Sequence, residues 1–461
     1  MELEFAGAAR EVTGSCHLLR VNGRTIALDC GLFQGHRQAT DEKNRRLPCP
    51  IESLDAVVLS HAHIDHSGRL PFLVREGYSK TIWATPATRD LSAIMLADSA
   101  HIQEKDAEFL ARRGKQYVAP LYTMRDAVRV PELTVSVPYH KQFDVVPGVR
   151  ATFVDAGHIL GSASVVLDCT EGTTTKRLVF SADIGRVGLP IIRDPEVPTG
   201  ADAVILESTY GDRLHESVAD SRAELRRVVV ETAARSGRIL VPAFAVGRTQ
   251  EVIYELHELL RAGEIPPIPI YIDSPLAIDA TGVFASHPDV FDDKEQLVQK
   301  VAKLFDFPLV RYTRTVEESK AIAQLRGPVI VIAASGMAES GRILHHLAQG
   351  ASDERNAILI VGFQAEHTLG RRIVEKQPVL KIFGEPVPLR ARVEIINGYS
   401  AHADQKELVA WLDVLKSSSP KLGPIFLVHG EPGPQEALAT VLRATGYSQI
   451  HAPTLGQRLT F

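Results

Sequence analysis

The stretch His61-Ala62-His63-Ile64-Asp65-His66 determines how the rest of this sequence is interpreted. It follows an apolar, β-branched run at 55–60 that predicts a buried strand, and it precedes residues 70–74, which predict the start of a helix. The hexapeptide is therefore expected in a loop at the carboxyl end of a strand. In extended backbone, side chains two residues apart project to the same side, so His61 and His63 can bind one ion together. Asp65 and His66 continue the loop and can reach a second ion.

These side chains predict a metal centre. Imidazole and carboxylate are ligands that zinc takes, and a set without thiolate is typical of a catalytic rather than a closed structural site. A chance cluster in a surface loop is the alternative. Three histidines and an aspartate in six positions would be rare by composition, because the chain has 17 histidines among 461 residues.

Length and composition indicate a two-domain globular protein. The 461 residues exceed the ~250–300 that one core usually serves. The hydrophobic fraction of 45% and the charged fraction of 23% are ordinary for a globular chain. Four cysteines without paired spacing favour reduced thiols. No signal-peptide pattern and no apolar run of ~18 residues is present, so a cytoplasmic protein without a membrane partner is expected.

The formal net charge of −5 argues against a non-specific nucleic-acid coat protein, because such proteins are usually basic. A polyanionic substrate would have to be held by local groups and by metal. One basic run, Arg112-Arg113-Gly114-Lys115, either contacts phosphate or forms a solvated face, and the solvated face is the favoured interpretation.

Polar side chains recur where predicted strands end. Asn22-Gly23 is typical of a type I′ hairpin turn, and the second strand of that hairpin ends at Asp29. Alone, Asp29 caps a turn as readily as it orients a metal-bound imidazole, and the nearby histidine loop favours the second role. The strands at 151–154, 177–181 and 203–206 lead to further metal-ligating types, namely His158, Asp183 and Glu207.

From about residue 209 to 373 the pattern changes to alternating buried strands and helices, which predicts a small parallel α/β unit inserted into the first domain. Two of its turns, Val246-Gly247-Arg248-Thr249 and Ala334-Ser335-Gly336-Met337, precede helices. The free N–H groups of such helix starts attract anions, although tight turns use the same residues. The strands at 392–396 and 425–428 then return to the first domain and lead to His402 and His429.

The ordered motifs resemble a known family. The hexapeptide with His158, Asp183 and Asp29 is similar to the four motifs of the metallo-β-lactamase superfamily. Glu207 in Leu206-Glu207-Ser208-Thr209-Tyr210, His402 in Ser400-Ala401-His402-Ala403-Asp404 and His429 in Val428-His429-Gly430-Glu431 look like motifs A, B and C of its β-CASP branch. The chain resembles bacterial and archaeal homologues of the endonuclease subunit of the mRNA 3′-end cleavage machinery, and ribonuclease J more distantly.

The resemblance implies an α/β fold, namely a metallo-β-lactamase αββα sandwich with an inserted parallel α/β β-CASP cap. The expected bounds are 1–208 for the first part of the metallo-β-lactamase domain, 209–373 for the cap and 374–461 for the completion of the first domain. Within the cap, Gln364–Gly370 carries His367 where the relatives usually have glycine, and no role for His367 is predicted.

The resemblance also implies a site with two zinc ions, manganese being the alternative. One ion would be bound by His61, His63 and His158, the other by Asp65, His66 and His429, with Asp183 bridging both. In the expected mechanism a bridging hydroxide attacks phosphorus in line. His402 acts as the general acid for the leaving 3′-oxygen, Glu207 orients His402, and Asp29 orients a metal-bound imidazole.

The expected substrate is single-stranded RNA, because RNA-directed family members carry histidine at the position of His429. The resemblance implies endonucleolytic cutting and products with 5′-phosphate and 3′-hydroxyl ends. It leaves 5′-to-3′ exonucleolytic cutting open. Arg248, Ser335 and Gly336 are expected RNA contacts, and a homodimer is left open. Two alternatives remain: a lactamase- or glyoxalase-like small-molecule hydrolase, and a non-catalytic RNA-binding scaffold. The long cap with His402 disfavours the first, and the full set of ligands disfavours the second.

Overall fold

The computed structural model describes residues 1–35, 37–112, 119–291, 305 and 307–461, so most of the basic run at 112–115 lies outside the described residues. The described chain divides into two compact units. Unit 1 is formed by Met1–Val187, Asp194–Leu214 and His402–Phe461. Unit 2 is formed by Gly188–Arg193 and His215–Ala401.

The first sheet of unit 1 contains the predicted hairpin and the strand before the histidine hexapeptide. Its order is β22-β1-β2-β3-β4-β5-β6, and the strands from β3 to β6 are parallel. Asn22 and Gly23 have φ angles of 52° and 71°, which confirms the expected type I′ turn between β2 and β3. The bounds are β1 (Glu2–Phe5), β2 (His17–Val21), β3 (Arg24–Leu28), β4 (Leu54–Val58), β5 (Ile82–Ala84), β6 (Thr134–Ser136) and β22 (Arg458–Thr460).

The second sheet of unit 1 contains the predicted strands that lead to His158, Asp183, Glu207 and His429. Its order is β21-β20-β11-β10-β9-β8-β7, in which β10, β11 and β20 are parallel. The strand β9 is antiparallel to both of its neighbours, so β8 runs in the same direction as β10. The bounds are β7 (Phe143–Val146), β8 (Val149–Asp155), β9 (Ala163–Glu171), β10 (Thr174–Phe180), β11 (Ala203–Glu207), β20 (Ile425–Val428) and β21 (Ile450–His451).

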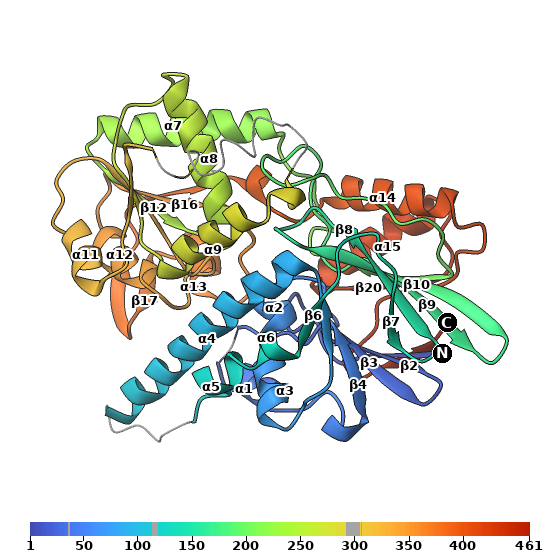
Figure 1. The fold of residues 1–461 in the computed structure, drawn as a ribbon. Helices are drawn as coiled ribbons and strands as arrows, with labels where there is room; N and C mark the ends of the chain where they lie inside the picture. The colour runs from blue at the N-terminus through green and yellow to red at the C-terminus, as the bar shows by residue number, and fades with distance from the viewer. Residues whose placement is uncertain (36, 113–118, 292–304, 306) are drawn as a thin grey trace. The chain divides into compact units, whose positions relative to one another are not determined.

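The two sheets of unit 1 pack face to face, with helices on their outer faces (Figure 1). Phe5 and Ile26 of the first sheet share one buried core with Phe153 and Ile205 of the second. The outer face of the first sheet packs against α3 (Leu70–Arg75) and α4 (Pro86–Arg112), and that of the second against α14 (Gln405–Ser417) and α15 (Pro432–Ala444). Successive side chains of a strand point to opposite faces of its sheet, and here both faces of each sheet pack against apolar residues. The predicted αββα sandwich is confirmed.

The histidine hexapeptide differs locally from the predicted loop. It is extended only to His63, and α2 (Ile64–Ser67) follows as a single helical turn. The Ser67 side chain donates hydrogen bonds to the carbonyl oxygens of Ala62 (2.9 Å) and His63 (3.0 Å), which fixes this turn. The expected helix start at 70–74 is confirmed by α3, which carries Pro71 in its first turn.

Pro86 starts the 27-residue helix α4. Two short helices follow it, α5 (Met124–Ala127) and α6 (Val130–Leu133), and α1 (Arg37–Asn44) precedes β4. Within the part of the chain that the structure describes, no helix is both long enough and apolar enough to cross a lipid bilayer.

Unit 2 is built on a parallel six-stranded sheet with the order β14-β13-β15-β12-β16-β19, as expected for the inserted α/β unit. Leu347 of α12 and Ile373 of α13 share a buried core with alternate residues of its strands, such as Val331. The strands are β12 (Arg238–Pro242), β13 (Ile270–Ile272), β14 (Val310–Tyr312), β15 (Val329–Ala333), β16 (Ala357–Ile360) and β19 (Arg392–Ile395). The other elements are α7 (Val218–Ala234), α8 (Arg248–Arg261), α9 (Pro275–Ser286), α11 (Val316–Ile322), α12 (Ile343–Gly350), α13 (Leu369–Val374) and the hairpin β17 (Val379–Ile382) and β18 (Glu385–Pro388).

The borders of the units differ from the bounds expected for the domains. The strand β19, expected in the first domain, pairs with β16 and belongs to unit 2. Apart from the short segment Gly188–Arg193, unit 2 begins after Leu214, where the expected cap begins after residue 208, and it ends at Ala401, where the expected cap ends at residue 373. The family-based domain bounds remain a prediction, because compactness and family membership divide a chain by different criteria.

A buried carboxylate ties several segments of unit 2 together. Asp273 directly follows β13 and is 1% exposed. Its Oδ1 atom accepts hydrogen bonds from the Thr313 hydroxyl (2.6 Å) and the Arg342 guanidinium (2.7 Å). Its Oδ2 atom accepts one from the Ser319 hydroxyl (2.5 Å) and lies 2.7 Å from Nε2 of His346. Burial alone would raise the pKa of Asp273, but these hydrogen bonds outweigh it and hold the pKa well below the ordinary value.

We predict that Asp273→Asn lowers the free energy of unfolding by about 3 kcal/mol, because removing one member of a buried ion pair leaves the other uncompensated. Urea denaturation followed by far-UV circular dichroism measures the change. The matched control is Asp279→Asn, which removes an exposed partner of Arg314 at 2.9 Å and should alter stability by less than about 0.5 kcal/mol. Equal effects of the two variants would contradict a structural role for the buried network.

The depressed pKa of Asp273 also predicts a pH dependence. Its ionised form is favoured in the folded state, so its contribution to stability is complete above the ordinary carboxyl pKa of ~3.9 and is lost as the pH falls below that value. The stability difference between wild type and Asp273→Asn should therefore shrink as the pH is lowered from about 6 to about 3. Thermal melts at several pH values test this, and a difference that grows on acidification would have the wrong sign.

Candidate metal centre

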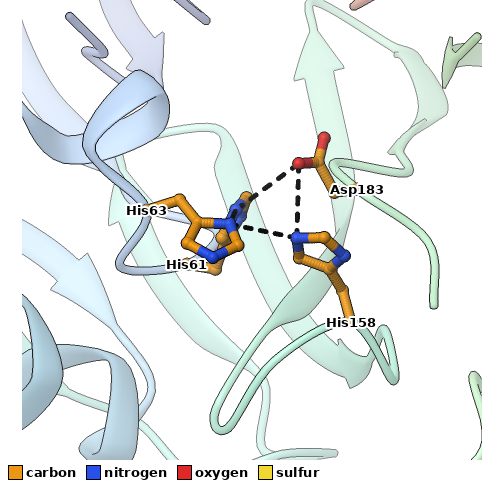
Figure 2. A group of neighbouring side chains, drawn as sticks. All are labelled: His61, His63, His158 and Asp183. Carbon is orange, nitrogen blue, oxygen red and sulfur yellow. Dashed lines mark hydrogen bonds and ion pairs between the residues drawn. The ribbon is translucent and has the colours of Figure 1, made fainter. Parts of the chain in front are cut away.

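The first group of predicted ligands converges in unit 1 (Figure 2). The Nδ1 atom of His63 lies 3.1 Å from Nε2 of His61 and 3.1 Å from Nε2 of His158. The Nε2 atoms of His61 and His158 each lie 3.5 Å from Oδ2 of Asp183. Four side chains from three segments therefore direct electron-pair donors toward one point.

This arrangement fits a cation better than a set of hydrogen bonds. A neutral imidazole has one N–H, so the Nδ1 atom of His63 cannot satisfy the two ring nitrogens that face it. A cation about 2 Å from each of several tetrahedral ligands separates those ligands by about 3.3 Å, which is close to the separations observed. The Oδ1 atom of Asp183 is also buried without a hydrogen-bond partner among the described residues. The donor set therefore fits a bound divalent cation.

A second group lies beside the first and shares Asp183 with it. The Nε2 atom of His66 lies 3.2 Å from Nε2 of His429 and 3.2 Å from Oδ2 of Asp183. The Nε2 atom of His429 lies 3.5 Å from Oδ2 of Asp65. Asp65, His66 and His429 can hold a second cation, as the sequence predicts.

Asp29 contacts the second group from behind. Its Oδ2 atom lies 2.7 Å from Nδ1 of His66, the ring nitrogen opposite the one that faces His429. The backbone N–H of Ser60 donates to Oδ1 at 2.8 Å, and the hydroxyls of Ser60 and Ser15 donate to Oδ2 at 3.0 and 3.1 Å. Asp29 thus fixes the orientation of the His66 ring and favours the tautomer with a free Nε2 lone pair. Ser15 and Ser60 were not predicted, although Ser60 adjoins the hexapeptide.

His402 and Glu207 form a neighbouring pair. The Nδ1 atom of His402 lies 3.2 Å from Oε2 of Glu207 and 3.9 Å from Oδ2 of Asp183. The His402 side chain is 17% exposed, whereas Glu207 is fully buried. Thr209 was missed by the sequence analysis; its hydroxyl donates to Oε2 of Glu207 at 2.7 Å and lies 3.1 Å from Nδ1 of His429. Its place two residues after Glu207 is a signal that could have indicated it, because such side chains share one side of a strand.

The local environment divides the histidines into two kinds. Burial, the largest influence, lowers the pKa of His61 well below its ordinary value and that of His63 to about 4. Burial also acts on His66 and His402, but nearby carboxylates outweigh it: Asp183 and Asp29 raise the pKa of His66, and Glu207 and Asp183 raise that of His402 to about 8. Burial would raise the pKa of Asp183, yet His429 and His66 hold it well below the usual carboxyl range.

A third set of neighbouring ligand types, Asp183, Glu207, His402 and His429, overlaps the first two groups. His402 and Glu207 could therefore serve as ligands rather than as an acid and its orienting partner. The metal content of a His402 variant distinguishes the two roles.

The expected RNA contacts all lie in unit 2, and one of them is already engaged. Arg248 starts α8, as predicted, but its guanidinium is buried in an ion pair with Glu251. The Ser335 hydroxyl accepts a hydrogen bond from the N–H of Glu339 at 3.2 Å. A Cβ at Gly336 would lie 2.6 Å from the ring of Phe244, so this position requires glycine. Their contact with RNA remains a prediction.

Three family models match the chain. The metallo-beta-lactamase superfamily matches residues 9–242, the Beta-Casp domain residues 249–373, and the Zn-dependent metallo-hydrolase RNA specificity domain residues 386–453. The fold and the convergent ligand groups are those of a metallo-β-lactamase-type metal centre. The chain belongs to the metallo-β-lactamase superfamily and, within it, to the β-CASP branch. The family expected from the sequence motifs is confirmed.

Relatives are similar over nearly the whole chain. Ribonuclease TTHA0252 of Thermus thermophilus is 37% identical over 95% of this chain and 95% of its own length. Transcription termination factor FttA of Methanocaldococcus jannaschii is 32% identical over 98% of this chain and 70% of its own length. A solved structure described as a protein of unknown function from Enterococcus faecalis V583 has a TM-score of 0.53 at 10% identity, covers 100% of this chain and 99% of its own, and supports the fold alone.

The contacts of Asp29 predict that Asp29→Asn weakens metal affinity by about 10–100-fold, because an amide holds the His66 ring less firmly in the ligating tautomer. Competition with a chromophoric zinc chelator measures this affinity. Asp144→Asn, which alters an exposed carboxylate on β7, is the control and should bind metal as the wild type does. Unchanged affinity in Asp29→Asn would mean that Asp29 only stabilises the turn.

Proposed function

We propose that the protein is a metal-dependent ribonuclease that hydrolyses phosphodiester bonds of single-stranded RNA. The observation that carries the proposal is the convergence of seven ligating side chains into two groups that share Asp183, with the His402–Glu207 pair beside them. The ligands are His61, His63, Asp65, His66, His158, Asp183 and His429. Two ions are proposed, zinc or alternatively manganese, because nitrogen and oxygen ligands suit both.

Each ligand group has a distinct part in this proposal. His61, His63 and His158 hold one cation, Asp65, His66 and His429 hold the other, and Asp183 contributes to both. Two divalent cations bound in this way supply a nucleophilic hydroxide at neutral pH and neutralise charge that builds on the phosphoryl oxygens. The protein fixes the ligands: Asp29 orients His66, and Thr209 connects Glu207 to His429.

His402 is the proposed general acid. Glu207 accepts a hydrogen bond from Nδ1–H of His402, which leaves Nε2–H of the imidazolium to donate a proton to the leaving 3′-oxygen. Its carboxylate neighbours favour the protonated ring, and its partial exposure leaves it open to a substrate. Proton transfer to the 3′-oxygen gives products with 3′-hydroxyl and 5′-phosphate ends.

RNA is the proposed substrate for two reasons. The RNA specificity domain matches residues 386–453, a stretch that contains both His402 and His429. The relative that is 37% identical over 95% of both chains is named a ribonuclease. Endonucleolytic cutting is proposed, and 5′-to-3′ exonucleolytic cutting is a further part of the proposal that end-labelled substrates test.

The experiment incubates the purified full chain with single-stranded RNA labelled at either end, after dialysis against chelator and reloading with zinc or manganese. Cleavage that depends on the added metal and leaves 5′-phosphate ends supports the proposal. Blocking the 5′ end separates internal cutting from 5′-to-3′ degradation. Turnover of a thioester or a β-lactam without RNA cleavage would replace the proposal with a small-molecule hydrolase.

We predict that His402→Ala retains its metal but cleaves RNA about 10²–10⁴-fold more slowly, because it lacks the proton donor. Metal content by inductively coupled plasma mass spectrometry and single-turnover cleavage rates are the two measurements. His140→Ala removes an exposed histidine of unit 1, paired with Glu196, and should match the wild type in both.

A second variant separates acid catalysis from ligation. Asp183→Ala should lose bound metal together with activity, because this carboxylate serves both ligand groups. If His402→Ala also lost a stoichiometric share of metal, His402 would be a ligand and the acid role would be excluded.

A further inference from the structure

The loop at residues 6–15 (the 6–15 loop) lies against the second ligand group. The Ala8 carbonyl accepts a hydrogen bond from the backbone N–H of His429 at 2.8 Å, and the N–H of Ser15 donates to the carbonyl of Asp65 at 2.8 Å. The hydroxyl of Ser15 also reaches Asp29. Backbone contacts to two metal ligands therefore hold this loop at the rim of the centre.

Arg10 differs from the rest of the 6–15 loop. Arg10 is exposed, whereas residues 7–9 and 12–15 are buried. Its φ angle of 64° lies in the left-handed region, which is unfavourable for a residue with a Cβ atom. Among the described residues, Arg10 has no hydrogen-bond or ion-pair partner. Arg10 is thus an exposed, unpaired guanidinium in a left-handed backbone position, two residues from the contact between Ala8 and His429.

Several other basic side chains of unit 1 are already engaged. The pairs are Lys43 with Glu11 (2.9 Å), Arg186 with Glu407 (3.5 Å), and Arg213 with Asp212 (2.8 Å). Arg69 is buried and donates to the carbonyl of Gly31 at 2.7 Å. In a chain with a net charge of −5, a polyanion depends on the few cations that are not neutralised locally.

We propose that Arg10 binds a backbone phosphate of the RNA strand beside the scissile phosphodiester, on the side of Asp65 and His429. The inference rests on the proposed function and adds a substrate-binding residue to it. A guanidinium binds phosphate oxygens through two parallel N–H bonds, so it positions the strand without reading the base. Backbone hydrogen bonds on either side of Arg10, from His429 to Ala8 and from Ser15 to Asp65, connect the 6–15 loop to two of the proposed ligands.

The test uses Arg10→Asn, because asparagine tolerates the left-handed conformation and removes the charge without disturbing the loop. The variant is made in the metal-loaded full chain that also carries His402→Ala, so that RNA is bound without being cleaved. Fluorescence anisotropy with a labelled single-stranded oligouridylate measures affinity over a series of salt concentrations. The matched control is Arg150→Asn. Arg150 is exposed near the start of β8, whereas His158 follows the end of that strand.

Arg10→Asn should bind the oligouridylate about 10-fold more weakly, the effect of losing a charge-assisted contact. The slope of log affinity against log salt concentration should fall by about 0.7, the value for one phosphate contact on a single strand. Arg10→Lys should keep the salt slope and regain only part of the affinity. In the cleavage-competent chain, Arg10→Asn should raise KM about 10-fold and leave kcat within about twofold.

Three outcomes decide the inference. A loss of affinity and of salt slope in Arg10→Asn, with an unchanged or higher melting temperature and a wild-type result for Arg150→Asn, supports it. Equal RNA binding by Arg10→Asn and Arg150→Asn, in a chain that cleaves RNA, overturns it and leaves the proposed function intact. A wild-type chain that neither binds nor cleaves RNA overturns the proposed function, and the role of Arg10 with it.

Discussion

The contacts of one carboxylate oxygen determine the architecture of the centre. Oδ2 of Asp183 lies 3.2 Å from Nε2 of His66 and 3.5 Å from Nε2 of His61 and of His158. His61 and His66 follow a strand of the first sheet, whereas His158 and Asp183 follow strands of the second. These contacts therefore exist only while the two sheets keep one register across their shared core, because a shift of a strand by one residue would reverse its side chains. The packing of Phe5, Phe153 and their neighbours thus positions the side chains around Asp183.

The direction of the strands explains why ligands so distant in sequence meet. In the second sheet, β8, β10, β11 and β20 all run the same way, with β9 returning between the first two. Their carboxyl ends therefore lie along one edge, and the segments that leave this edge carry His158, Asp183, Glu207 and His429. Irregular backbone at the ends of strands can turn side chains toward a common point. Ala182 and His429 both adopt positive φ angles there, of 50° and 50°.

The sequence predicted what depends on local pattern. Apolar runs marked the strands that lead to the ligands, and the spacing in the hexapeptide indicated paired imidazoles. Membership of β19 in the sheet of unit 2 depends on pairing with a distant strand, which no local pattern encodes. The hydrogen bond of Ser15 to Asp29 spans 14 residues and the contact of Thr209 with His429 spans 220, so neither contact could be predicted from local pattern. The ion pair of Arg248 with Glu251 is different, because their spacing of three residues on a helix was open to prediction.

The histidines of this centre have pKa values shifted in opposite directions, and nearby carboxylates account for the upward shifts. Burial is the largest influence on His61 and His63 and lowers the pKa of both, although Asp183 acts against it at His61 and Asp65 and Asp183 act against it at His63. Neutral rings are what metal ligation requires. Burial also acts on His402, but Glu207 at 3.2 Å favours its protonated form, as the proposed role of general acid requires. Glu207 can do this because it is fully buried and fixed by the N–H of Ile184 at 2.6 Å and by Thr209. Because β11 ends at Glu207, the end of this strand places a buried carboxylate beside His402.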